Sequence, residues 1–125
     1  MKEVMAIIRI NKMNETKRAL ADAGFPSVTA TGRVLGRGKG LVDLKVLEGA
    51  TKGHQEAISQ LGGAPRLMPK RLITLVVKDE NVDLAVKTLI KVNSFGNAGD
   101  GKIFVMPVLD SYRVRTGERG NATLD

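Results

Sequence analysis

The sequence repeats one order of elements twice, and this repetition most constrains the fold. In each half, an apolar β-branched run precedes a stretch with apolar residues at helical spacing, and a second β-rich run follows. The expected segments, in chain order, are strand 3–10, helix 13–23, strand 27–35, strand 72–77, helix 82–90 and strand 102–108. Strand–helix–strand taken twice predicts an α+β, ferredoxin-like fold, in which both helices cover one face of an antiparallel sheet.

The ends of these elements carry their own signals. Asn11 or Asn14 is a candidate cap for the first helix, Gly24 is suited to end it in the left-handed conformation, and Asp79 is a candidate cap for the second helix. The alternating stretch "YRVRT", residues 112–116, predicts a short fifth strand. The strands "VMAII" and "LITLVV" are apolar on both sides, so we expect assembly to bury the second face of the sheet.

A long segment, residues 36–70, joins strands that a few residues could link. Loops of this length in compact domains are usually functional or mobile. "LVDLKVL" is suited to extend the strands as a ribbon, "GHQEAISQL" is suited to form a turn or two of helix, and basic residues outnumber acidic ones. We interpret the segment as a partner-binding loop; the alternative is a surface excursion without a role.

Composition limits the remaining possibilities. A chain of 125 residues is the length of one domain, predicted here to span 1–125. It has no cysteine, which excludes disulfides and thiolate metal sites and favours a cytoplasmic location. No apolar run is long enough to span a bilayer, so membrane insertion is not expected. The net charge of +7 favours an anionic ligand or partner, although a solvated basic surface would have the same composition.

The stretch "GNAGDGKI", residues 96–103, nearly matches a nucleotide-binding P-loop. A P-loop needs a Ser or Thr after its lysine to bind Mg²⁺, and it lies between a strand and a following helix. Here Ile103 follows Lys102, and the order is helix, loop, strand. The stretch is therefore not a P-loop, which leaves a plain glycine turn or a phosphate site of another design.

Other residues suited to phosphate lie elsewhere in the chain. On the predicted strand 112–116, Arg113 and Arg115 would leave the same face, because side chains alternate along a strand. Arg37 and Lys39 lie among the glycines of "GRGKG". Arginine forks match phosphate oxygens, and glycines let a backbone approach them closely. Each of these groups alone is weak evidence for a phosphate site, since glycine turns and solvated arginines are common.

Taken together, these motifs resemble a known family. "GDGKIFVMPV" followed by "YRVRTGE" closely resembles the C-terminal signature of the PII nitrogen-regulatory signalling proteins, and "MKEVMAIIRINKMNETKRALADAGF" and "GRGKG" also resemble that family. The resemblance implies a trimeric barrel, either a homotrimer or a mixed trimer with a paralogous chain. It also implies a T-loop at about 36–70, a B-loop at about 96–102 and a C-terminal segment at 112–125.

The resemblance further implies that ATP or ADP binds between neighbouring subunits. The residues that match nucleotide-binding positions of the family are Thr29, Arg37, Val76, Gly99, Asp100, Gly101, Lys102, Arg113 and Arg115. In this interpretation the B-loop surrounds the phosphates, the two C-terminal arginines approach across the interface, and Thr29 and Val76 border the adenine. The loop "GNAGDGKI" then needs no Ser or Thr, because it does not bind the metal.

A second effector, 2-oxoglutarate, is also implied. The residues that match its site are Gly38, Lys39, Gly40 and Lys70, where Lys70 matches a lysine that pairs with the effector's carboxylate. Many members have glutamine where Gly38 stands, and its side chain helps to bind the Mg²⁺ that 2-oxoglutarate chelates. Gly38 lacks that group, so the Mg²⁺ ligands are left unassigned. The loop also lacks the family's modifiable tyrosine, because the only tyrosine is Tyr112.

A lengthened, tyrosine-free loop looks most like the nitrogenase-associated subtype, which predicts nitrogenase as the regulated target. The alternatives within the family are an ammonium transporter or glutamine synthetase. A basic RNA-binding module of the RRM type shares the element order but needs aromatic residues for base stacking, and aromatics make up only 3% of the chain. Nucleic-acid binding is therefore not expected. Enzymatic activity is not expected either, because the single histidine, His54, has no organised catalytic partners in the sequence.

Overall fold

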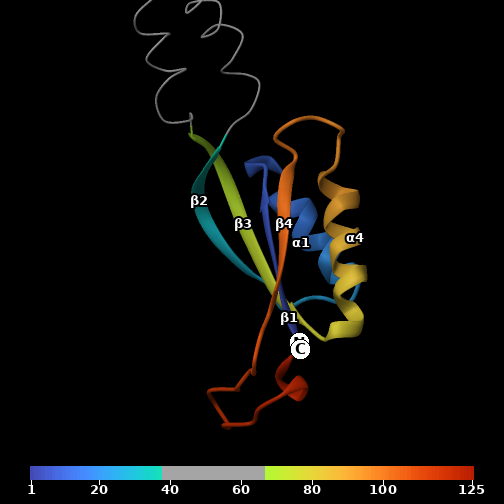
Figure 1. The fold of residues 1–125 in the computed structure, drawn as a ribbon, viewed down its shortest axis with the longest axis vertical. Helices are drawn as coiled ribbons and strands as arrows, with labels where there is room; N and C mark the ends of the chain where they lie inside the picture. Colours follow the sequence, from blue (N-terminus) through green and yellow to red (C-terminus); the bar gives the residue numbers. More distant parts are fainter. Residues whose placement is uncertain (38–66) are drawn as a thin grey trace, which may run out of the picture.

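The computed structural model describes residues 1–37 and 67–125 of the chain, and of Arg37 it describes only the backbone. These described residues form four strands and two α-helices. Figure 1 shows both helices on the same side of the sheet. In chain order the main elements are β1 (Lys2–Ile8), α1 (Met13–Asp22), β2 (Thr29–Arg37), β3 (Leu67–Val77), α4 (Val82–Asn93) and β4 (Gly101–Pro107). The sheet is antiparallel with the order β2-β3-β1-β4. The predicted α+β, ferredoxin-like fold is confirmed.

The apolar core lies between the sheet and the helices. Alternate residues of the two central strands are buried, and Val4 and Ala6 of β1 lie opposite Leu75 and Ile73 of β3. Leu89 of α4 packs against this layer and is 1% exposed. The intervening strand residues point to the other face, which neither of the two described α-helices covers in Figure 1. The sheet therefore has one covered face and one open face.

The open face is largely apolar, as the sequence predicted. Met5 and Ile7 of β1 and Leu72 of β3 lie on it and are only partly buried, and Phe104 of β4 is 42% exposed. The register places Met5 beside Phe104 and Ile7 beside Lys102. The open face thus combines apolar side chains with Lys102 of β4.

The two helices begin at the predicted residues but lack the predicted caps. Neither Asn11, Asn14 nor Asp79 caps a helix, because each helix follows a short 3-10 turn and begins without a side-chain cap. Asp79 instead forms an ion pair with the amino group of Met1 at 2.9 Å. The end of α1 is as predicted, since Gly24 follows it with a positive φ of 99°.

The strands β2 and β3 form the base of the long loop. They are paired from Thr29↔Thr74 as far as Arg37↔Leu67, with an irregularity between Ala30 and Arg33. The strand pair thus includes both ends of the predicted loop 36–70. The predicted ribbon, the predicted helical turns and His54 lie outside the described residues.

The predicted fifth strand is wrong. Residues 112–116 form a turn, with only an isolated bridge between Tyr112 and Arg119. The backbone N–H of Arg113 donates to the carbonyl of Glu118 at 2.8 Å, so this segment pairs with itself and not with the sheet. Among the described residues, no helix is long and apolar enough to cross a membrane.

Candidate functional site

The loop between α4 and β4 has a backbone that depends on glycine. Gly96, Gly99 and Gly101 all have positive φ, at 77°, 93° and 133°. Gly101 also has no space for a side chain, because a Cβ there would lie 2.3 Å from the carbonyl oxygen of Ile7. We call residues 96–101 the phosphate loop. Its glycines let its backbone approach β1 closely and leave N–H groups unshielded by side chains, as phosphate binding requires.

Asp100 stabilises the phosphate loop from within. One oxygen of its carboxylate accepts the backbone N–H groups of Phe95 at 2.7 Å and Asn97 at 3.2 Å. The other oxygen accepts a hydrogen bond from the guanidinium of Arg9 at 3.1 Å. The Phe95 hydrogen bond is the main cause that lowers the pKa of the Asp100 carboxyl, with Asn97 and Arg9 adding to it against the effect of burial. Asp100 is therefore ionised near neutral pH, and its carboxylate bonds to the protein itself.

Two basic side chains from other strands also bond to the loop. Arg9, which follows β1, donates to the carbonyl of Ala98 at 3.3 Å as well as to Asp100. Lys70 of β3 donates to the carbonyl of Gly99 at 2.9 Å. Sequence reasoning identified Lys70 but missed Arg9, which lies 91 positions from its partner Asp100. The loop is thus connected directly to the strand that carries one end of the long loop.

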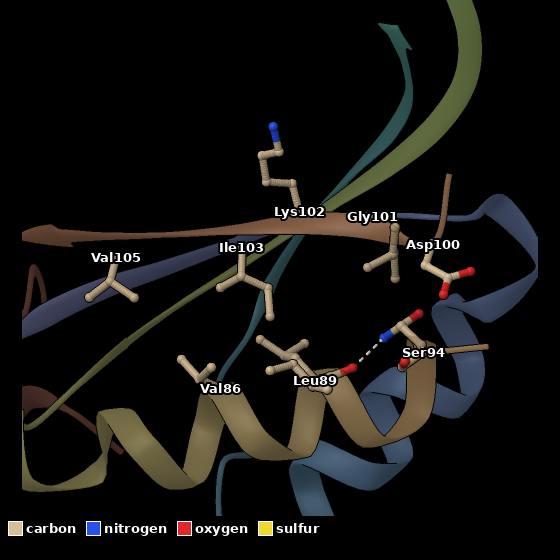
Figure 2. Close-up of a pocket in the computed structure, with 11 residues that line it drawn as sticks. Val86, Leu89, Ser94, Asp100, Gly101, Lys102, Ile103 and Val105 are labelled. Atoms are coloured by element: carbon tan, nitrogen blue, oxygen red, sulfur yellow. Dashed lines mark hydrogen bonds between the residues drawn. The ribbon is translucent and has the colours of Figure 1, made fainter. Parts of the chain in front are cut away.

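A cavity of about 420 Å³ lies beside these groups on the open face of the sheet. Its lining consists of Ile7, Gly36, Lys70, Gly99, Gly101, Lys102 and Phe104. Figure 2 shows Lys102 on the opposite side of β4 from Ile103, which points toward α4. The cavity thus combines two ammonium groups with glycine backbone and two apolar side chains. This combination suits an anion attached to a less polar group.

The environment of Lys70 is consistent with an anion site. Burial lowers the pKa of its ammonium, the nearby Arg9 charge lowers it further, and Asp100 partly offsets both. A pKa lowered by burial and by a neighbouring cation means that the positive charge is incompletely compensated here. An added anion would supply the missing compensation.

A second cavity, also of about 420 Å³, lies on the other side of β4. Figure 2 shows Val86 and Leu89 of α4 facing Ile103 and Val105 of β4 across it. Its lining is mainly apolar, with Ser94 at the end near Asp100. Lys70 and Lys102 together line the first cavity, so we take the first cavity as the candidate site.

The structure brings together Gly99, Gly101, Lys102 and Lys70 of the predicted residues, with Asp100 in an internal role. It does not bring Thr29 or Val76 to the same cavity. Thr29 pairs with Thr74, and Val76 borders a smaller hollow near the C-terminus. The backbone of Arg37 lies at the base of the long loop. Gly38, Lys39 and Gly40 lie outside the described residues.

The two C-terminal arginines differ from the prediction. Because residues 112–116 form a turn, Arg113 and Arg115 do not leave one face of a strand. The Arg113 guanidinium is paired with Glu118 at 3.2 Å and with Asp125 at 3.3 Å, and it also donates to the carbonyl of Ala122. Arg115 is exposed. The prediction that both arginines reach the phosphates across a subunit interface concerns a neighbouring chain and stays a prediction.

The site offers no ready set of metal ligands in its described part. Among residues 1–37 and 67–125, no group of three His, Cys, Asp or Glu side chains could bind a metal ion. Asp100 is the only carboxylate among the site residues described above, and both of its oxygens already accept hydrogen bonds. The Mg²⁺ ligands stay unassigned.

Comparison with known proteins identifies the family. The family model described as "Nitrogen regulatory protein P-II" matches residues 1–118. The chain belongs to the P-II family. The resemblance inferred from the sequence motifs is therefore confirmed.

Several P-II relatives match over almost the whole chain. The chain is 47% identical over 126 residues to "Nitrogen fixation nifHD region GlnB-like protein 2" of Methanothermobacter marburgensis, covering 99% of this chain and 100% of the relative. It is 36% identical over 124 residues to "Nitrogen regulatory protein P-II 1" of Escherichia coli, with coverage of 99% and 100%. Among solved structures, Arabidopsis thaliana PII bound to citrate matches with a TM-score of 0.70 at 31% identity, covering 97% of this chain and 86% of that one. The names of these P-II relatives describe regulatory proteins, some in a nitrogen-fixation context.

Proposed function

We propose that this chain is a P-II-type sensor of nitrogen status, which binds ATP or ADP and 2-oxoglutarate and regulates a target protein without catalysing a reaction. The observation that supports this best is the cavity beside the phosphate loop, where Lys70 and Lys102 face glycine backbone. A nucleotide offers both kinds of group that this lining suits: phosphates for the lysines and N–H groups, and a less polar base.

The rest of the nucleotide site belongs to a neighbouring subunit in this proposal. Val76 pairs with Glu3 near the start of β1, whereas the cavity lies where Ile7 pairs with Lys102 near its end. Val76, which is proposed to border the adenine, therefore lies toward the other end of the sheet from the cavity that is proposed to bind the phosphates. A trimer, formed from identical chains or with a paralogue, brings one end of a protomer to the other end of the next.

The proposed role of 2-oxoglutarate depends on Lys70. Its ammonium bonds to the Gly99 carbonyl, and a dicarboxylate in the cavity would be a stronger, charged acceptor. Lys70 lies on β3 at the base of the long loop. If its ammonium leaves the Gly99 carbonyl for the effector, the effector binds one conformation of the long loop better than another, and this difference lets it shift the loop. The relative solved with citrate carries a ligand of similar chemistry. Mg²⁺ would be bound by backbone groups, water, the effector or a partner chain, because Gly38 has no side chain to offer.

The most favoured target is nitrogenase, inhibited through the long loop until 2-oxoglutarate rises. Support comes from relatives named for the nifHD region, which match at 47% and 48% identity. An ammonium transporter or glutamine synthetase is the alternative target. Pull-down of each candidate with ATP, with and without 2-oxoglutarate, distinguishes them. Binding that ignores 2-oxoglutarate would contradict the switch, and release that survives Lys70→Ala would contradict the assigned effector site.

The nucleotide site is tested with Arg115→Ala. Arg115 is exposed and is proposed to contact the phosphates bound by the next protomer. Charge-assisted hydrogen bonds contribute about 1.5–3 kcal/mol, so we expect the ATP affinity to fall roughly tenfold or more. Calorimetric titration measures this, with Arg18→Ala on the exposed face of α1 as a control of equal charge. Equal ATP affinity in the Arg115 variant and the wild-type chain would contradict the assignment.

A further inference from the structure

The phosphate loop contains a feature that opposes its proposed task. Asp100 lies between Gly99 and Gly101, and its carboxylate is negative near neutral pH. A negative group in an anion site repels the ligand, and the repulsion is strongest where solvent is partly excluded. The Asp100 side chain is 20% exposed, so water screens it incompletely. Anion binding at this loop therefore requires a neighbouring positive charge that compensates Asp100.

Arg9 is the positive group that contacts Asp100 directly. Its guanidinium lies 3.1 Å from the carboxylate, and the same nitrogen donates to the carbonyl of Ala98 at 3.3 Å. Lys70 bonds to the Gly99 carbonyl and not to the carboxylate. Arg9 thus bonds to two points of the loop, one charged and one backbone, while the backbone N–H groups of Phe95 and Asn97 bond to the other carboxylate oxygen.

The path of the chain fixes Arg9 in this place. It follows directly after β1, whose last residue, Ile8, pairs with Gly101 at the start of β4. The backbone of Arg9 is extended before the 3-10 turn Ile10–Lys12 begins. Its side chain is 35% exposed, but its Nε atom is buried and has no hydrogen-bond partner. The side chain is therefore confined beside the loop and not extended into solvent.

We propose that Arg9 is the positioning residue and counter-ion of the phosphate loop. By neutralising Asp100 it allows the carboxylate to order the loop without repelling the anion that the loop binds. This inference rests on the proposed function, because it concerns affinity for the same phosphates. It goes beyond that function by assigning to Arg9 a role that acts through Asp100 and not through contact with the ligand.

The charge argument predicts a particular pattern of variants. Arg9→Met removes the counter-ion and leaves Asp100 unpaired, so ADP should bind about tenfold more weakly. Asp100→Asn keeps an oxygen that accepts the Phe95 and Asn97 N–H groups, so the loss should be about threefold or less. In the double variant no uncompensated negative charge is left beside the ligand. Its affinity should therefore exceed that of Arg9→Met alone.

Calorimetric titration with ADP measures these affinities in the full chain, and circular dichroism verifies that each variant is folded. Arg18→Met on the exposed surface of α1 removes the same charge elsewhere and should bind ADP as the wild type does. Arg9→Lys retains the charge and should recover most of the affinity. If the double variant binds ADP more weakly than Arg9→Met, the role of Arg9 is structural packing alone and the counter-ion proposal is wrong.

A second measurement does not need the nucleotide. The Asp100 carboxyl can be titrated by carbon NMR in the wild-type chain and in Arg9→Met, and its pKa should rise in the variant. An unchanged pKa would overturn the pairing. Failure of the wild-type chain to bind ADP would overturn the proposed nucleotide function and this inference together. Wild-type binding combined with unchanged affinity in Arg9→Met would overturn the inference alone.

Discussion

Replacing Gly101 by alanine tests the geometry of the phosphate loop most directly. An alanine Cβ would lie 2.3 Å from the Ile7 carbonyl oxygen, and the backbone φ of 133° is disfavoured for any residue with a side chain. The disfavoured backbone costs about 1–3 kcal/mol and the forced overlap about 1–3 kcal/mol more. The start of β4 must therefore move away from β1. We expect the melting temperature to fall by about 10 °C or more, and ADP affinity to fall at least about tenfold.

Gly96→Ala is the matched control for Gly101→Ala. Gly96 also has a positive φ, of 77°, but a Cβ there has no other atom within 4 Å. It incurs only the backbone term, about 1–2 kcal/mol, and should lower the melting temperature by about 4–8 °C while leaving ADP affinity within about threefold. Differential scanning calorimetry and ADP titration measure both quantities. Equal effects of the two substitutions would refute the argument that close contact with Ile7 sets the loop geometry.

Three further predictions concern the fold around the site. Thr16→Val removes the hydroxyl that accepts the Asn93 amide at 3.2 Å between the two helices, and should lower the free energy of unfolding by about 1–2 kcal/mol in urea denaturation; no change would contradict this role. The pKa of the Asp79 carboxyl is lowered, mainly by its hydrogen bond from the terminal amino group. The stability that this ion pair gives the fold is therefore complete above about pH 4 and is lost as the pH falls further. Asp79→Asn should flatten that acid limb in melts across pH, and an unaltered limb would count against the pair. Phe104→Ser on the open face should weaken self-association in sedimentation equilibrium, whereas Leu84→Ser, equally exposed on α4, should not; equal behaviour would exclude the open face as the interface.

Much of the fold could be predicted from the sequence because its signals are local. Alternation and helical spacing identified the strands and α-helices of the described residues to within a few positions. The exception is the start of β3, which is five residues earlier than predicted because that strand pairs with β2 up to Arg37. Both helices begin at the predicted residues, but the predicted caps were wrong: Asn11, Asn14 and Asp79 have capping chemistry, whereas the chain enters each helix through a 3-10 turn. Capping residues indicate a helix start only where the backbone before it is extended.

The errors in the site have a different cause, since they depend on contacts between distant residues. The stretch "YRVRT" alternates as a strand does, but a strand also needs a partner, and Arg113 pairs with Glu118 five positions later. Arg9 was missed because its partner Asp100 lies 91 positions away, and no local pattern links them. The motif around Asp100 predicted that it contacts the nucleotide, but it gave no sign that the carboxylate accepts the backbone N–H groups of Phe95 and Asn97.

The open face of the sheet connects the proposed assembly to the proposed ligand site. Ile7 and Phe104 line the cavity and also belong to the apolar surface that no helix covers. Covering an exposed apolar face of this kind with another surface removes its side chains from water and stabilises the protein. If a neighbouring protomer covers the face, it also encloses the cavity, lowers its effective dielectric constant and strengthens the attraction of Lys70 and Lys102 for an anion. Nucleotide binding and assembly then involve the same surface, and each should stabilise the other.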